Sequence, residues 1–239
     1  LLIANIKMYR TDYKRYKPSV ADFDKKCLKD IYSLGVKFFI GQFAGLVVFN
    51  SSSIIISHFI NPTETAIYNS AWTYFGVLVI FNNMLLQPII TAVTDAYVKR
   101  ELDWIKGAFS KLRLYNVGLT IVSVLMLLVS PYVFKIWLGG KLLIPLSLSI
   151  VMSIYFILNI WVSPYWAFLS GVGKLDISLL LALFKIVAFI PAALLMIKKF
   201  DTVGMLAAII IINTLPNFIF GIIQYRKIVN DKARGIWNK

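Results

Sequence analysis

The sequence predicts an all-α, polytopic membrane protein: a bundle of six transmembrane helices. Composition is the first observation, because 59% of the 239 residues are apolar and 15% are charged, whereas soluble domains are roughly 45–50% apolar and about 25% charged. The second is that the apolar residues form long runs, near or above the roughly 20 residues that span hydrocarbon. The third is a one-sided distribution of positive charge. Together with a mean hydropathy of +0.77, these observations also exclude a disordered chain.

Six apolar segments can be read in order along the chain. They cover about residues 33–59, 66–97, 112–134, 142–169, 175–197 and 203–225. The breaks between them are Asn61-Pro62, a charged connector at 99–113, Pro131 with Gly139-Gly140, residues 171–174 and residues 198–201. Turn formers and charged residues of this kind interrupt helices. These segments predict three parts of the chain. Residues 1–30 are the end of a preceding helix plus a basic cytoplasmic linker, residues 31–225 are the six-helix transmembrane lobe, and residues 226–239 are a basic cytoplasmic tail.

Positive charge predicts how the bundle is oriented. Of the 25 lysines and arginines, 19 fall on one side: eight in residues 7–30, five in 99–113, Lys174, and five in 226–239. Four fall on the other side, in the segments after the third and fifth spans. Because cytoplasmic loops carry the excess of Lys and Arg, both ends of the chain are expected in the cytoplasm.

Groups that carry catalysis or bind metal are absent from the sequence. One cysteine, Cys27, and one histidine, His58, cannot form a metal site. Paired carboxylates, a phosphate loop, and a Ser or Cys beside a base are all missing. The sequence therefore predicts no catalytic residue, no metal, no cofactor and no enzyme. Nucleic acid is not expected either, since the net charge of +14 follows from topology.

Polar side chains form a stripe along the second span. Its members are Asn69, Thr73, Gly76, Asn83, Gln87, Thr91 and Thr94. Their spacing of three, four or seven residues places them on one helix face. Amides in hydrocarbon cost free energy unless they find partners or water, so the stripe is expected to face the bundle interior. A tight helix interface remains open as an alternative, but the length of the stripe favours a wet cavity.

Shorter stripes recur in three other spans. The third contains Asn116, Thr120, Ser123 and Ser130, the fourth Ser149, Asn159, Ser163, Trp166 and Ser170, and the sixth Asn213, Asn217 and Gln224. Hydroxyls, amides and aromatic rings around a shared lumen suit sugars, which present hydroxyls and apolar faces. The same side chains could also serve helix packing alone.

Two lysines lie inside predicted spans. Lys185 is ten residues into the fifth span, too deep to reach the headgroups easily, and a cation at that depth indicates function. It could contact an anionic substrate or pair with Asp95 near the cytoplasmic end of the second span. Lys37 lies near the cytoplasmic headgroups, where it could meet a phosphate or simply extend to the interface.

Short motifs in order along the chain resemble a known family. They are residues 88–97 (PIITAVTDAY) with Asp103-Trp104-Ile105, Ile136-Trp137-Leu138-Gly139, residues 168–174 (FLSGVGK) and Gly235-Ile236-Trp237. This series resembles the polysaccharide-biosynthesis flippases, including the Wzx-type O-antigen transporters, which belong to the superfamily of multidrug and toxin exporters. The resemblance covers essentially the whole chain, as the C-terminal half of such a protein. An opening of Leu1-Leu2-Ile3 without an initiator Met fits that expectation.

The resemblance implies one lobe of a twelve-helix transporter in a bacterial inner (plasma) membrane. Its function would be to flip a polyprenyl-diphosphate-linked oligosaccharide from the cytoplasmic to the periplasmic leaflet for O-antigen or other surface polysaccharide synthesis. Its partners would be that substrate, membrane lipid and an N-terminal six-helix half. The expected substrate-binding residues are Lys185, Lys37, Asn69, Thr73, Asn83, Gln87, Asn159 and Trp166.

Two other functions remain open from the sequence. A drug or cation exporter of the same superfamily would need an acidic site within the membrane, and Asp95 is the only carboxylate near a span interior. A membrane enzyme of the polysaccharide pathway, such as a polymerase or acyltransferase, would need a catalytic cluster in a large loop, and every loop here is short.

Overall fold

The computed structural model describes residues 25–238 of the chain. They form the helices α2 (Lys25–Phe59), α3 (Pro62–Val98), α4 (Leu102–Trp137), α5 (Leu146–Val172), α6 (Asp176–Ile209), η3 (Ile210–Thr214), α7 (Leu215–Val229) and η4 (Gly235–Asn238). Residues 1–24 of the predicted linker, and Lys239 of the predicted tail, lie outside the described residues. From Lys37 onward the chain is one compact unit, and every contact described below lies within it.

Five of the described helices are long and apolar enough to cross a membrane: Tyr32–Phe59, Pro62–Val98, Leu102–Trp137, Leu146–Val172 and the continuous stretch Asp176–Val229. The fold is therefore all-helical and typical of a membrane protein, as predicted. The last stretch has 54 residues, which as a straight helix would be about 80 Å long. It is interrupted at Phe200 and Asp201, where the backbone leaves helical geometry and Asp201 takes a φ of 51°.

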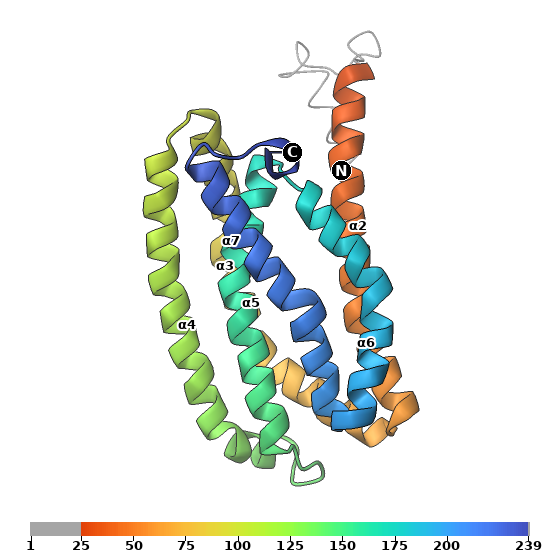
Figure 1. Cartoon of the computed structure of the whole chain (residues 1–239). Coiled ribbons are helices and arrows are strands. Elements are labelled where there is room, and N and C mark those ends of the chain that lie inside the picture. Colours follow the sequence, from red (N-terminus) through yellow and green to blue (C-terminus); the bar gives the residue numbers. More distant parts are fainter. Residues whose placement is uncertain (1–24, 239) are drawn as a thin grey trace, which may run out of the picture. The chain divides into compact units, whose positions relative to one another are not determined.

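The chain reverses direction at this interruption, and α7 runs back beside α6 (Figure 1). Gly204 lies directly against the preceding helical segment there, because a Cβ atom on it would be 2.1 Å from the carbonyl oxygen of Met196. The predicted break at residues 198–201 is thus the site of the turn. Beyond it, the π-helical segment η3 precedes Pro216, which cannot donate a backbone hydrogen bond to the previous turn.

Helix α5 is the centre of the unit, with contacts to α3, α4, α6 and α7 (Figure 1). Its buried Tyr155 and Phe156 pack around Trp72 of α3, with ring centroids 5.0 and 5.2 Å from the indole. Near its other end, a Cβ atom on Gly171 would lie 2.8 Å from the backbone oxygen of Ile90. Only glycine permits this close approach of α3 and α5.

The prediction of a charged connector at residues 99–113 is wrong for most of that range. Helix α4 begins at Leu102, so the connection is a short turn, and residues 102–113 are helical. The reason is amphipathic spacing: Ile105, Phe109 and Leu112 are buried at intervals of three or four residues, whereas the charged side chains occupy the exposed face. The helix also continues past Pro131 to Trp137.

Most of the polar stripe of α3 does not face the core of the unit, contrary to the prediction. The exceptions are Asn83, which lines a cavity between helices, and Thr94, whose Oγ1 donates to the backbone oxygen of Gly171 in α5 at 2.8 Å. All side chains of the stripe are exposed, and Gly76 is intermediate. Larger apolar residues on the opposite face, including Phe75, Leu78 and Leu86, are buried instead, because α5 packs on that side. The shorter stripe of α4 is buried or half-buried, and three of its members bond to α5. Asn116 Nδ2, for example, donates to the backbone oxygen of Ile160 at 3.1 Å.

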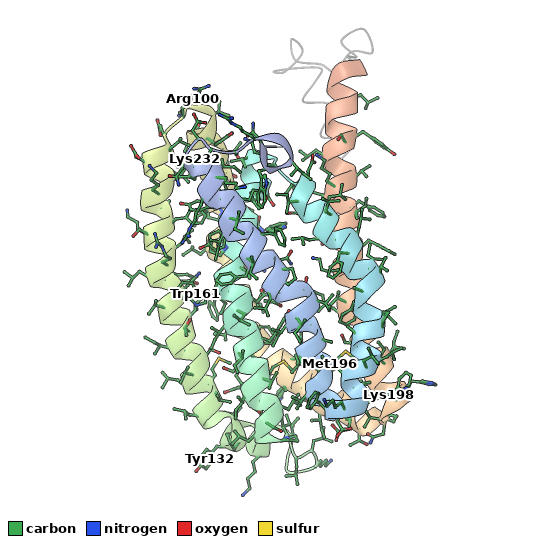
Figure 2. The ribbon with its side chains drawn as sticks, viewed as in Figure 1. Arg100, Tyr132, Trp161, Met196, Lys198 and Lys232 are labelled. Carbon is green, nitrogen blue, oxygen red and sulfur yellow. The ribbon has the colours of Figure 1, made fainter. Side chains whose placement is uncertain are left out.

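The cationic side chains separate toward the two ends of the helices. Figure 2 shows Arg100 and Lys232 at one end and Lys198 at the opposite end. This is the separation that the charge count predicted for the connections between spans.

The tight reversal at Gly204 gives a stability prediction. We expect Gly204→Ala to lower the free energy of unfolding by about 1–3 kcal/mol, because the new methyl group meets a backbone carbonyl that must shift. The measurement is the thermal unfolding midpoint of the detergent-solubilised full-length protein.

Gly107→Ala is the matched control for that variant. Gly107 lies in α4, and a methyl group added to it would meet no other atom within 4 Å, so its midpoint should stay the same or rise slightly. Equal midpoints for both variants would contradict the close packing at Gly204.

Candidate functional site

Helices α3, α5, α6 and α7 surround a cavity of about 270 Å³, the amide cavity. Its polar side chains are Asn83, Asn159, Ser163, Ser178, Asn217 and Gln224. Trp166, Leu169 and Leu181 supply apolar surface in the same wall. Such a cavity offers many neutral hydrogen-bonding groups beside an aromatic ring, a combination that suits a ligand with both hydroxyls and apolar faces.

Hydrogen bonds to neighbouring helices orient the polar groups of this cavity. Ser163 Oγ accepts a bond of 2.6 Å from Nδ2 of the buried Asn82 in α3. Gln224, which is fully buried, donates from Nε2 to the backbone oxygen of Lys174 at 3.2 Å. The first bond joins α3 to α5, and the second joins α7 to the turn after α5, so both help to fix the cavity wall.

A second cavity of about 230 Å³, the lysine cavity, lies between α2, α5, α6 and α7. Its polar lining consists of Lys37, Gln42, Trp166, Ser178, Lys185 and Asn217. Trp166, Ser178 and Asn217 line both cavities. The two spaces therefore adjoin, one lined by neutral groups and the other carrying two ammonium groups.

The two lysines of the lysine cavity differ in their surroundings. Lys37 forms an ion pair with Asp176 at the start of α6. Lys185 has no carboxylate within 4.0 Å among the residues that the structure describes. Asp95, considered above as a partner for Lys185, instead pairs with Lys99 at 2.7 Å. This hydrogen bond from the Lys99 ammonium to the Asp95 carboxylate raises the pKa of Lys99.

The structure brings five of the eight expected binding residues together. Asn83, Asn159 and Trp166 line the amide cavity, and Lys37, Lys185 and Trp166 line the lysine cavity. The other three, Asn69, Thr73 and Gln87, line neither cavity and lie on the exposed stripe of α3. Asn69 also accepts a hydrogen bond from Ser53 of α2 at 3.1 Å.

Five polar cavity residues were missing from the expected binding set: Gln42, Ser163, Ser178, Asn217 and Gln224. Ser163 and Asn217 belong to the short polar stripes of their spans, so periodicity could have found them. Gln42 belongs to no stripe, and only the folded arrangement of α2 beside α6 and α7 places it at the lysine cavity.

The fold and the two cavities define a multi-pass membrane protein with a polar, partly cationic site between its helices. Within the described residues, no group of three or more His, Cys, Asp or Glu side chains gathers to hold a metal ion. The two cavities combine neutral amides and hydroxyls with two ammonium groups.

Comparisons with known proteins agree with the resemblance seen in the motifs. Residues 1–94 match the family described as polysaccharide biosynthesis protein. A Yersinia pseudotuberculosis protein named "Putative O-antigen export protein" is 26% identical over 158 residues, which cover 64% of this chain and 35% of that protein. The chain is thus similar to polysaccharide-biosynthesis and O-antigen export proteins, and its matched part spans about a third of the Yersinia protein. No solved structure matches the chain.

The cavities can be tested by cysteine accessibility. In a cysteine-free background of the full-length protein, Ser178→Cys should react with a hydrophilic thiol reagent, because Ser178 lines both cavities. Ser149→Cys serves as the control, since Ser149 is buried away from them with 1% of its surface exposed. Mass spectrometry of the intact protein measures the modified fraction. Equal labelling at the two positions would contradict a water-accessible cavity at Ser178.

Proposed function

We propose that the chain is the C-terminal lobe of a flippase that moves a polyprenyl-diphosphate-linked oligosaccharide from the cytoplasmic to the periplasmic leaflet. The observation that carries this proposal is the pair of adjoining cavities, one with two ammonium groups and the other with neutral amides. The diphosphate would lie near Lys37 and Lys185, the glycan in the amide cavity, and the lipid chain in the bilayer. The product would serve O-antigen or other surface polysaccharide synthesis.

The chemistry of each cavity supports its proposed ligand. Ammonium groups bind phosphate oxygens through charge-assisted hydrogen bonds. Amide and hydroxyl groups match the hydroxyls of sugars, and the half-exposed Trp166 ring offers a surface for an apolar sugar face. The name of the Yersinia relative, an O-antigen export protein, fits a substrate of this kind.

The charge of the cavities favours an anionic ligand over a cationic drug. Within the described part of the chain, neither cavity wall includes an acidic side chain. An exporter of cations would need such a group. A transporter is also favoured over a membrane enzyme of the same pathway by the relative's name.

We propose further that the stretch Asp176–Val229 crosses the membrane twice, which makes six crossings in all. Its length exceeds the roughly 30 Å hydrocarbon thickness more than twofold, and its reversal at Phe200 and Asp201 lies near Lys198, at the end opposite Arg100 and Lys232 (Figure 2). By the positive-inside rule, the Arg100 end lies in the cytoplasm and the Lys198 end in the periplasm of an inner membrane.

The exposed stripe of α3 is proposed to face a second six-helix lobe. Asn69, Thr73 and Gln87 would then border an aqueous passage between the lobes, since amides exposed to lipid would cost free energy. Alternating access by rocking of the two lobes would carry the headgroup across.

The role of Lys185 can be tested by complementation. In a strain that lacks its own flippase, the full-length protein with Lys185→Ala should export about tenfold less surface polysaccharide, because a charge-assisted bond to the diphosphate is lost. Lys185→Arg should retain part of the export.

Lys198→Ala is the matched control, as it removes the same charge from the other end of α6 (Figure 2). It should export normally. Undiminished export by Lys185→Ala, at equal protein level, would refute the role proposed for Lys185.

Topology is tested by single cysteines at positions 174, 198 and 232 in the cysteine-free protein. Membrane-impermeant reagent outside intact spheroplasts should label position 198 only, because the proposed double crossing puts residues 174 and 232 in the cytoplasm. Inverted vesicles should give the opposite pattern. Labelling of positions 174 and 198 from the same side would contradict two crossings.

A further inference from the structure

The carboxylate of Asp176 stands beside the lysine cavity and has no part in the function proposed above. Asp176 is the first residue of α6, and its Oδ1 pairs with the Lys37 ammonium from α2. Its neighbours Leu175 and Ser178 line the lysine cavity together with Lys37. Lys37 is therefore shared: it belongs to the cavity wall and to an internal ion pair at the same time.

This ion pair differs from the other two in the described part of the chain. Lys99 with Asp95 and Lys106 with Asp103 are pairs within one helix turn, and their side chains are 50% or more exposed. Lys37 and Asp176 connect two helices, and their side chains are only 20% and 24% exposed. Exposed pairs are weak and screened by salt, so the Lys37 pair is the one that can affect a neighbouring site strongly.

The pair also divides the charge of the lysine cavity into two parts. Asp176 neutralises Lys37, while Lys185 lies nine residues later in α6, about 13 Å further along the helix. The pair is near the end of the helices where α6 begins, and Lys185 is deeper. An anion that enters from that end meets the neutralised lysine first and the ammonium of Lys185 afterwards.

We propose that Asp176 is a positioning residue that competes with the phosphate groups of the substrate for Lys37. This inference rests on the proposed function, because it takes the lysine cavity as the site of the diphosphate. In the absence of ligand, the carboxylate holds the Lys37 ammonium at the cavity wall. When a phosphate anion binds, it replaces the carboxylate as the ionic partner of Lys37. No covalent bond is made or broken in this exchange.

The physical benefit of such a competitor is faster release of the diphosphate. A partly buried ammonium left without any anion is costly, so a site of two bare lysines would hold a diphosphate tightly and let it go slowly. Asp176 restores a partner to Lys37 as the phosphate leaves. The carboxylate thus lowers the affinity for the anion and lowers the barrier to its departure.

The test measures binding of inorganic pyrophosphate to the full-length protein in lipid nanodiscs by calorimetry. Asp176→Asn keeps the size of the side chain and removes its charge. We expect the dissociation constant to fall about tenfold, within the range of coupling between neighbouring charged groups. Adding Lys37→Met to Asp176→Asn should abolish this gain. A merely structural role for Asp176 would not make binding tighter.

Asp95→Asn is the matched control, because it makes the same change of charge at an exposed lysine pair outside both cavities. Its dissociation constant should equal that of the unmodified protein. If Asp176→Asn unfolds at a lower temperature, Asp176→Ser provides a second neutral variant with a side chain suited to a helix start.

Two outcomes separate a failure of this inference from a failure of the proposed function. If Lys185→Ala weakens pyrophosphate binding but neither neutral variant of Asp176 tightens it, the role of Asp176 is overturned and the anion site stands. If the unmodified protein does not bind pyrophosphate, or Lys185→Ala leaves the affinity unchanged, the anion site is overturned and the role of Asp176 with it.

Discussion

The packing of α5 against four other helices is the constraint on which the rest of the unit depends. In hydrocarbon, association of helices relies on close packing and on hydrogen bonds between them. Lipid tails are as apolar as the apolar side chains, so no hydrophobic force drives the helices together. Helix α5 uses both kinds of contact: Tyr155 and Phe156 enclose Trp72, and Ser153 shares a hydrogen bond of 3.0 Å with Ser123 of α4. With these contacts made, Asn159, Ser163 and Trp166 are left to line the amide cavity.

The reversal at Asp201 has a comparable consequence for the site. It returns the chain as α7, which delivers Asn217 and Gln224 to the amide cavity opposite Asn83 and Ser163. Without that turn, the cavity would lack the wall that α7 supplies. The close contact of Gly204 with Met196 shows how little space the turn leaves.

The strength of each charged interaction in the unit depends on how deeply its two groups are buried. Exposed lysines at the ends of the helices indicate how the bundle is oriented in the membrane. Their ion pairs with Asp95 and Asp103 contribute little to the stability of the fold. The partly buried Lys37 has a carboxylate of its own, whereas Lys185 has none within the described residues. This inequality gives the lysine cavity a net positive charge at its deeper end, which matches the anionic headgroup proposed as its ligand.

The sequence by itself determined the membrane environment, the helical fold, the approximate spans and the polar character of their faces. These properties depend on runs and periodicities within single segments, so no partner is needed to read them. It also singled out Lys185, because a charge within a long apolar run is visible without a structure. The breaks at Asn61 and at residues 198–201 were also predictable, because turn-forming and charged residues that interrupt an apolar run are visible in the sequence.

Only the tertiary structure decided which groups meet. The α3 stripe could be placed on one face by its period, but whether that face is inside depends on the larger apolar residues opposite and on where α5 packs. The pairing of Lys37 with Asp176, and the position of Gln42, join residues far apart in the chain. Such contacts are set by helix packing, and a single helix contains no information on which neighbour it will face.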